Sequence, residues 1–365
     1  MKAESNERLE TSEPIKSSKN LTCFFKGFQV DYRMDWVRNS IHYIRDNWNN
    51  TTWHEMMLDK LYKEFSISIC RDILKQKNWI DEENVSTINK TNFDLLRYYT
   101  TDDGYNKLKN MNEAFRDKDL NFDRCNIATY LVELMNIELY NFIKTNPENN
   151  DFEGTIYRGF LPTTSEAHDV FERDFLLEKN IYPISAHQIA IPLEFMSASL
   201  DKNKALEYST RGKKSINQTP ILLEIKVRNL NKDLIEIYKS FYPDSPVTSL
   251  CAVPIEKISA KPEDKEVLLR GAFLQILETH LNEPIVRIET VMLNANRDHI
   301  KTHKYKNTNA QNLFRSLVKQ DKMRICKELT DNEEDRKRYM AEEESAKIET
   351  EKNIEISKKE TIFER

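Results

Sequence analysis

The chain has 365 residues, of which 39% are hydrophobic and 10% aromatic, so it is long enough to bury a sizeable core. Its formal net charge is -5, which argues against a nucleic acid or an anionic membrane surface as a partner. No apolar run long enough for a signal peptide or a transmembrane segment follows the first residues, so we expect a cytoplasmic or otherwise soluble protein, and a monomer. Five scattered cysteines without a Cys-x-x-Cys pair indicate neither a disulfide framework nor a zinc site.

The first third of the chain predicts helices. Residues 1–30 are polar and lack periodicity, so we expect a flexible arm there. Residues 31–90 are expected to form a helical extension, because apolar residues recur every three or four positions and Asn50 offers a cap between two such runs. The apolar positions of these two helices and of a later one are Val37, Ile41, Ile44 and Trp48; Trp53, Met57, Leu61 and Phe65; and Leu131, Leu134, Met135, Leu139 and Phe142. Further helices are expected over 70–77 and from Tyr99 toward Phe115.

From residue 153 onward, short β-branched and aromatic stretches separated by polar loops predict a sheet. The clearest stretches are 155–157, 221–227 and 286–292. Two further apolar runs flank Arg270 and Gly271, and we expect them to form a hairpin with its turn at these residues. Helices followed by strands indicate an α+β fold.

The end of the chain is dominated by charge. Residues 296–365 are expected to form a charged tail that is helical or disordered, and the part after 331 reads as a solvated or frayed helix. His299 and His303 are four residues apart and could share a helix face. No Cys-rich partner set or His-Glu-x-x-His pattern accompanies them, so surface histidines are favoured over metal ligands.

Arg158 closes a predicted strand and is followed by Gly159, one of only six glycines in the chain. A guanidinium offers a planar fork with a permanent charge, which suits a pyrophosphate or a ribose phosphate. A glycine at the next position would let backbone amide groups approach a flat ligand closely. In isolation, Tyr-Arg-Gly is more often a surface arginine beside a turn glycine.

Residues 195–199 have the alternation of a strand, so Phe195, Ser197 and Ser199 share one face. Such a face can pack an aromatic ring and hydrogen-bond a ribose. Ser-x-Ser on a strand usually has no function when it stands alone. A helix is expected to begin behind Asp201.

Asp264 and Glu266 are two residues apart, so on an extended segment both carboxylates point into the same cleft. A carboxylate beside a ribose stabilises the oxocarbenium-like transition state of glycosidic cleavage, and Glu266 suits this role. Asp264 lies nearer the rim, where it could orient and help deprotonate a nucleophile such as a guanidinium. The competing interpretation of Asp264 and Glu263 is a solvated acidic loop.

In this order, Arg158, Ser197-Ala198-Ser199 and Asp264-Lys265-Glu266 resemble the Arg, Ser-x-Ser and Glu-x-Glu signature of the arginine-specific mono-ADP-ribosyltransferases. The resemblance covers roughly residues 90–295. It implies a catalytic domain over 91–295 with a split, mixed β-sheet, a helical N-terminal lobe and a helical, charged C-terminal extension. It also implies NAD+ as a substrate, no metal, and an acceptor protein with an exposed arginine as the partner.

The resemblance further implies residue roles. Those implied for catalysis are Glu266, Asp264, Ser197 and Arg158, and those implied for NAD+ binding are Arg158, Gly159, Phe195, Ser197, Ser199 and Glu266. Asp264 stands where the family usually has Glu, which shortens the reach of the carboxylate by about 1.5 Å. Two alternatives therefore stay open: an NAD+ glycohydrolase that uses the same site with water as acceptor, and a catalytically silent interaction module.

Overall fold

The computed structural model describes residues 43–44, 46–47, 50–67, 93–107, 122–160, 188–191, 195–211, 220–245, 247–270, 272–280, 285–297 and 308–363. The arm expected over 1–30, most of the helix expected over 37–48, and the helix expected over 70–77 lie outside these residues, as do Phe115, Gly271, His299 and His303.

The described chain is a mixture of helices and strands, as expected for an α+β fold. The helices whose bounds lie within the described residues are α2 (Thr51–Phe65), α4 (Asp94–Tyr99), α6 (Phe122–Thr145), α9 (Lys202–Thr210), α10 (Lys232–Phe241), α11 (Thr308–Leu329) and α12 (Glu333–Phe363), with short 3-10 helices η4 (Pro147–Asn149) and η6 (Pro262–Asp264). Residues 102–107, in the helix expected from Tyr99 toward Phe115, are helical as well. The strands are β1 (Gly154–Phe160), β2 (Gln188–Ile191), β3 (Met196–Ser199), β4 (Ile221–Arg228), β5 (Val247–Thr248), β6 (Ala252–Pro254), β7 (Glu266–Leu269), β8 (Ala272–His280), β9 (Val286–Leu293) and β10 (Asn296–Arg297).

Eight strands form one sheet in the order β2-β8-β9-β4-β1-β3-β7-β6, and β5 pairs with β10. The sheet is mixed, because β4 and β9 run parallel while its other pairs are antiparallel. The sheet is split as expected into two halves, β2-β8-β9-β4-β1 and β3-β7-β6. A single residue pair, Tyr157 of β1 with Ser199 of β3, connects them. Buried side chains from both halves, such as Ile156 and Ala198, belong to one apolar cluster. The two halves therefore face each other across a shared core.

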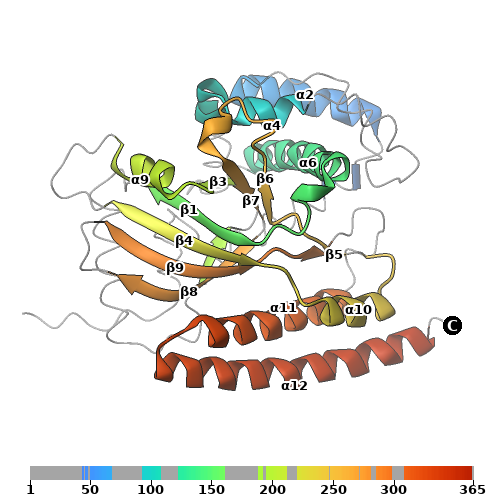
Figure 1. Ribbon diagram of the computed structural model, residues 1–365. Helices are drawn as coiled ribbons and strands as arrows, with labels where there is room; N and C mark the ends of the chain where they lie inside the picture. Colours follow the sequence, from blue (N-terminus) through green and yellow to red (C-terminus); the bar gives the residue numbers. More distant parts are fainter. Residues whose placement is uncertain are drawn as a thin grey trace, which may run out of the picture.

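Helices lie on two sides of the strands. Figure 1 shows α2, α4 and α6 gathered on one side, and α10, α11 and α12 on the opposite side. The first group packs on β6 and β7, since Leu96, Leu131 and Leu268 share one buried cluster. The second group packs on β8 and β9 through residues such as Met323 and Val291. Among the described residues, no helix combines the length and the apolar character needed to cross a membrane.

The predicted helices α2 and α6 are confirmed. Asn50 caps α2, because its side chain accepts a hydrogen bond of 3.1 Å from the backbone N–H of Trp53. The apolar positions predicted from the periodicity are all buried: Trp53, Met57, Leu61 and Phe65 in α2, and Leu131, Leu134, Met135, Leu139 and Phe142 in α6.

The hairpin expected at Arg270 is wrong. β7 pairs with β3 and β6, whereas β8 pairs with β2 and β9 in the other half of the sheet. The backbone N–H of Arg270 donates to Cys251 O at 3.1 Å, and its side-chain Nε donates to Leu250 O at 3.2 Å. Both edges of β7 already have partners, so the chain crosses from one half of the sheet to the other at this point.

The charged tail is helical, as expected, but one of its faces is buried rather than solvated. α12 packs along α11, and the Tyr339 hydroxyl donates to Ile276 O of β8 at 3.1 Å. The buried positions of α12 recur with a spacing of three, four or seven residues: Tyr339, Glu343, Ala346, Thr350 and Ser357. Only the first of these is a large apolar residue, which explains why the hydrophobic pattern did not predict the packing.

Candidate functional site

A cavity of about 560 Å³ lies where β1, β3, β7, α9 and the end of α4 meet. Its size is within the usual range of small-molecule sites. It is lined by six of the residues singled out from the sequence: Arg158, Gly159, Ser197, Ser199, Asp264 and Glu266. Segments more than 100 residues apart in the sequence thus converge on one concavity, as the three motifs predict.

Glu266 and Ser197 contact each other in the cavity lining. Glu266 is paired with Ser199 in the β3–β7 ladder, so Ser197 lies diagonally from it on the neighbouring strand. The Ser197 hydroxyl donates to Glu266 Oε1 and shares a hydrogen bond of 3.0 Å with the Tyr99 hydroxyl. Burial raises the pKa of Glu266 to about 7, and the charge of Asp264 adds to this effect, while the Ser197 hydrogen bond and Arg158 oppose it.

Arg158 is held against the same strand. Its guanidinium Nη1 donates to the backbone carbonyl of Ser197, which fixes a positive charge beside the Glu266 carboxylate. Tyr99 completes the group. Burial and the nearby Glu266 charge raise the pKa of the Tyr99 phenol, so its hydroxyl stays protonated and keeps its capacity to donate.

Asp264 reaches the cavity by another route than the expected extended segment. It ends η6, and Lys265 adopts a left-handed conformation with φ of 46° before β7 begins at Glu266. Asp264 Oδ2 accepts a hydrogen bond of 3.1 Å from the Tyr208 hydroxyl, and Oδ1 lies 3.8 Å from Lys204 Nζ. Both partners belong to α9, so Asp264 is held to this helix.

Ser199 fixes the turn that carries Asp264. Its hydroxyl donates to the backbone carbonyl of Asp264 at 2.6 Å and accepts from the backbone N–H of Asp201 at 2.9 Å. The second serine therefore ties η6 and the start of α9 to the end of β3.

Gly159 is required by packing as well as by the cavity that it lines. A Cβ atom at this position would lie 1.6 Å from the backbone oxygen of Ala205 in α9. The glycine therefore lets α9 approach β1 closely, which brings Tyr208 and Lys204 to Asp264.

Phe195 lies in the core rather than in the cavity lining of the described residues. Its side chain is only 1% exposed and belongs to the cluster shared with α6. Its ring meets that of Tyr99 edge-on, with centroids 6.4 Å apart. Phe195 therefore packs against Tyr99 from the core and helps to hold the Tyr99 ring in place.

Several cavity residues were not singled out from the sequence as site residues: Tyr99, Tyr208, Arg211 and Lys261. Tyr208 and Arg211 are three residues apart at the end of the helix that follows Asp201, so their position relative to the second motif was the available signal. Arg158, Arg211 and Lys261 line the cavity together with three carboxylates, Asp102, Asp264 and Glu266, and Lys261 is paired with Asp102. The two guanidinium groups suit a ligand that carries phosphate groups.

No protein-family model and no curated protein matches the chain. Among solved structures, the chain is similar to the Vis toxin, an ADP-ribosyltransferase from Vibrio splendidus, with 14% identity over 63% of this chain and 90% of that chain and a TM-score of 0.37.

Two further structures are comparably similar. An ADP-ribosyltransferase from Clostridium botulinum has 16% identity over 67% of this chain and 96% of that chain, with a TM-score of 0.35. The ADP-ribosyltransferase HopU1 of Pseudomonas syringae pv. Tomato has 12% identity over 65% of this chain and 97% of that chain, with a TM-score of 0.36. These values are too low to assign an activity, which has to be inferred from the side chains themselves.

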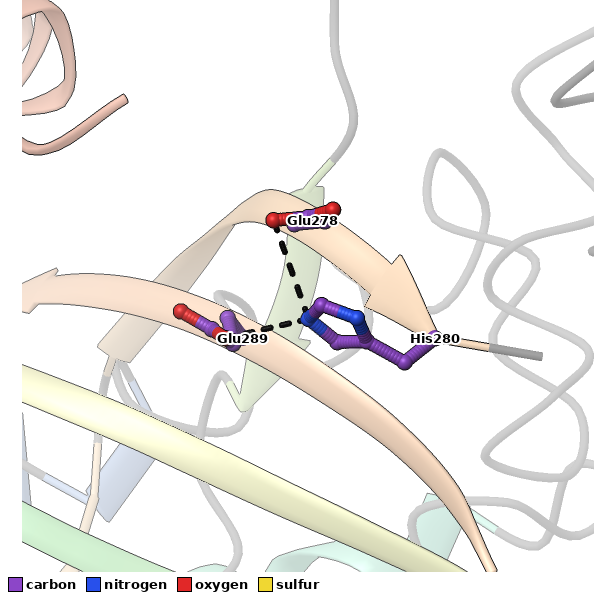
Figure 2. A group of neighbouring side chains, drawn as sticks. All are labelled: Glu278, His280 and Glu289. Carbon is purple, nitrogen blue, oxygen red and sulfur yellow. Dashed lines mark hydrogen bonds and ion pairs between the residues drawn. The ribbon is translucent and has the colours of Figure 1, made fainter. Parts of the chain in front are cut away.

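A second group of polar side chains lies outside the cavity, on β8 and β9. Figure 2 shows Glu278, His280 and Glu289, whose potential ligand atoms all lie within 4.8 Å of one another. His280 Nε2 is 3.0 Å from Glu289 Oε1 and 3.7 Å from Glu278 Oε2. This geometry would suit a metal only if the carboxylates were otherwise unengaged.

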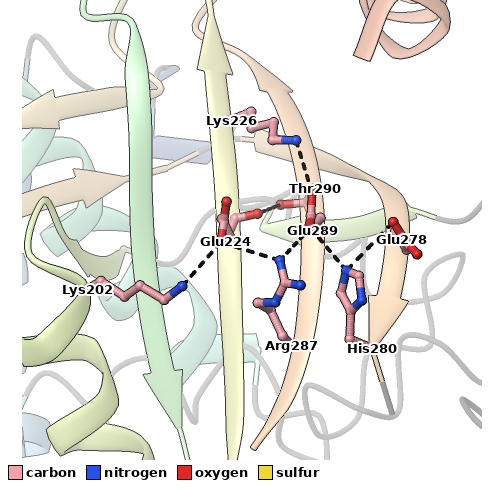
Figure 3. A network of polar contacts seen from close by, with 8 residues as sticks. All are labelled: Lys202, Glu224, Lys226, Glu278, His280, Arg287, Glu289 and Thr290. Carbon is pink, nitrogen blue, oxygen red and sulfur yellow. Dashed lines mark hydrogen bonds and ion pairs between the residues drawn. The ribbon is translucent and has the colours of Figure 1, made fainter. Parts of the chain in front are cut away.

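Glu289 is engaged by two cations. Figure 3 shows its carboxylate between Lys226, at 3.0 Å, and Arg287, at 2.5 Å. These cations hold the pKa of Glu289 below its usual value against the opposing effect of burial. A divalent cation would have to displace both of them, so we assign the group to an ion-pair network on the sheet.

Proposed function

We propose that the chain cleaves the bond between nicotinamide and ribose in NAD+ and transfers the ADP-ribose to an acceptor. The observation that carries the proposal is the contact between Ser197 and Glu266 within one cavity that Arg158 also lines. This is the arrangement that the resemblance of the three motifs to the arginine-specific mono-ADP-ribosyltransferases implies.

In this proposal Glu266 stabilises the cationic ribose of the transition state and binds a ribose hydroxyl. The reaction needs the ionised carboxylate, although burial raises the pKa of Glu266 in the free protein. Bound NAD+ would lower the pKa of Glu266 again, because the positively charged nicotinamide ring next to the carboxylate favours its ionised form. Ser197 orients Glu266 and hydrogen-bonds the substrate.

Two guanidinium groups support the binding of the diphosphate. Arg158 is already oriented by Ser197 O, and Arg211 lines the same cavity. Gly159 exposes backbone at the cavity wall for the nicotinamide carboxamide, and Ser199 keeps the adjacent turn in place. Phe195 acts through Tyr99 rather than by direct contact with nicotinamide.

The acceptor that we propose is the guanidinium of a protein arginine, with Asp264 as the residue that orients it and helps to deprotonate it. A second candidate acceptor is water, which would make the protein an NAD+ glycohydrolase. One observation favours this alternative: both oxygens of Asp264 already face partners on α9, Tyr208 and Lys204, so an incoming guanidinium must compete with them.

The test is incubation of the purified chain with NAD+ and agmatine, a small guanidinium compound. We expect nicotinamide release together with ADP-ribosyl-agmatine. Nicotinamide with free ADP-ribose alone would identify the hydrolase. Absence of nicotinamide release would leave the interaction module.

Variants decide whether Glu266 performs the chemistry. Glu266→Gln should lower nicotinamide release by about 10²-fold to 10³-fold, as expected when a group that stabilises transition-state charge is removed. Glu263→Gln alters an exposed carboxylate of the same loop and is the matched control, which should retain activity. Equal activities of the two variants would contradict the assigned role of Glu266.

A further inference from the structure

The buried carboxylate of Glu138 lies outside the cavity but is connected to it. Glu138 belongs to α6 and is only 4% exposed. Its Oε2 accepts a hydrogen bond of 2.9 Å from the backbone N–H of Leu96, and its Oε1 accepts one of 3.3 Å from the backbone N–H of Leu95. These are the second and third residues of α4, whose N–H groups have no acceptor within the helix.

Glu138 replaces a local cap. The residue at the N-cap position of α4 is Phe93, which has a left-handed φ of 41° and makes no side-chain capping bond. A helix of six residues is not stable by its own hydrogen bonds, so its contacts with the rest of the fold determine its position. The carboxylate of Glu138 provides polar contacts at this end, from a residue more than 40 positions away in the sequence.

The other end of α4 reaches the cavity. Tyr99 is its last residue and lies one turn beyond Leu95 on the same helix face. The Tyr99 hydroxyl is hydrogen-bonded to Ser197 Oγ, which in turn donates to Glu266. A displacement of α4 would therefore be transmitted through Tyr99 to Ser197 and Glu266.

We propose that Glu138 is a positioning residue for NAD+ cleavage: by capping α4 it fixes Tyr99 against Ser197, and Ser197 in turn orients Glu266. The inference rests on the proposed function for the reaction, and on the described contacts alone for the coupling between Glu138 and Tyr99. Glu138 itself touches neither the cavity nor the reacting atoms.

The experiment is a double-mutant cycle on Glu138 and Tyr99. Glu138→Ala should lower kcat for nicotinamide release by about tenfold or more with little change in KM, because misplacement of a catalytic group acts mainly on the chemical step. Tyr99→Phe should lower kcat as well. The double variant should be no slower than Tyr99→Phe by more than about twofold, since Glu138 acts through Tyr99.

Two further variants separate positioning from a loss of stability. Glu138→Gln keeps one amide oxygen to accept the Leu96 N–H and should recover part of the lost kcat. Glu133→Gln changes another buried carboxylate of α6 and should leave kcat unchanged. All assays are run well below the melting temperature of each variant.

The same cycle measured by thermal unfolding needs no turnover. The loss of Tm caused by Tyr99→Phe should be smaller in the Glu138→Ala background than in the wild type. Additive effects on Tm, or additive effects on kcat in an active protein, would overturn the inference. A wild-type chain that releases no nicotinamide while its Tm values remain non-additive would overturn the proposed function and leave the coupling supported.

Discussion

The proposed role of Glu266 places two conflicting requirements on its side chain. It has to lie close to a ribose in a partly dehydrated cavity, and it has to be ionised there. Burial raises its pKa to about 7, whereas the Ser197 hydrogen bond and the Arg158 charge favour the ionised form. A side chain held in this state costs the folded protein stability whenever it is charged.

This cost predicts a pH-dependent effect of Glu266→Gln on stability. Between pH 4.5, the usual pKa of a glutamate, and about 7, the folded protein keeps a proton on Glu266 that the unfolded chain has released. The free energy of unfolding therefore falls as the pH rises through this window. Glutamine carries no charge, so the Tm of Glu266→Gln relative to the wild type should rise from pH 5 to pH 8.

Burial also raises the pKa of Glu138 to about 7, so both carboxyl groups contribute to the pH dependence of the wild-type Tm. The difference in Tm between Glu266→Gln and the wild type therefore reports on Glu266 alone. Glu263→Gln, at an exposed position, serves as the control in thermal unfolding monitored by circular dichroism. If the difference in Tm between Glu266→Gln and the wild type stays constant with pH, burial does not raise the pKa of this carboxyl group.

Asp264 shows what a single sequence can and cannot predict about a site. The spacing of Asp264 and Glu266 correctly predicts that both face one cavity. It does not predict the left-handed Lys265 between them, nor Tyr208 and Lys204, because these partners depend on how α9 packs. In the proposed reaction, such contacts would govern the choice of acceptor.

We therefore expect two substitutions in α9 to favour transfer over hydrolysis. Tyr208→Phe removes a hydrogen bond to Asp264, and Lys204→Met removes the nearby positive charge. Each should raise the ratio of ADP-ribosyl-agmatine to free ADP-ribose. For Tyr208→Phe we expect about a fivefold rise, since one hydrogen bond is worth about 1 kcal/mol. Chromatography of products from labelled NAD+ measures the ratio.

Lys202→Met is the matched control for Lys204→Met. Lys202 lies in the same helical turn, but its Nζ is 3.9 Å from Glu224 rather than close to Asp264. Its substitution should leave the product ratio unchanged. A similar change in both lysine variants would mean that the net charge of α9, and not contact with Asp264, controls acceptor choice.

The contact between α9 and β1 shows that the sequence does not predict how entire helices and strands pack against each other. Helix α9 and strand β1 were both expected, but their contact depends on the absent side chain at Gly159. The sequence suggested a ligand as the reason for this glycine, while the structure adds the backbone oxygen of Ala205. Likewise, β7 and β8 were predicted as strands, but their partners depend on the chain crossing between the two halves of the sheet.

Gly159→Ala should consequently destabilise the protein. The added methyl group would lie 1.6 Å from Ala205 O, so α9 has to move, at a cost of about 1–3 kcal/mol typical of overpacked sites. Nicotinamide release should fall at the same time, because Tyr208 and Asp264 move with the helix. Urea unfolding gives the free energy, with Thr155→Ala on the same strand as a control that adds no atom. A Gly159→Ala protein of wild-type stability would contradict this packing.

The assembly of the molecule follows from the two faces of its sheet. One set of helices covers β6 and β7, another covers β8 and β9, and the two sheet halves enclose a third cluster between them. Hydrophobic periodicity predicted α2 and α6, which bury large apolar side chains. It missed the packing of α12, whose buried face consists mainly of Glu, Ala, Thr and Ser residues. Helices that precede the strands in the chain and helices that follow them both pack on the sheet. The domain boundaries expected from the sequence remain predictions.

The packing of α12 predicts opposite outcomes for two neighbouring residues. Tyr339 is fully buried against β8, whereas Met340 is 55% exposed. Tyr339→Ala should lower the free energy of unfolding by about 3–5 kcal/mol, the usual cost of truncating a buried aromatic side chain. Met340→Ala should change it by less than about 0.5 kcal/mol. Urea unfolding of the full chain measures both, and small effects of both substitutions would restore the original expectation of a solvated helix.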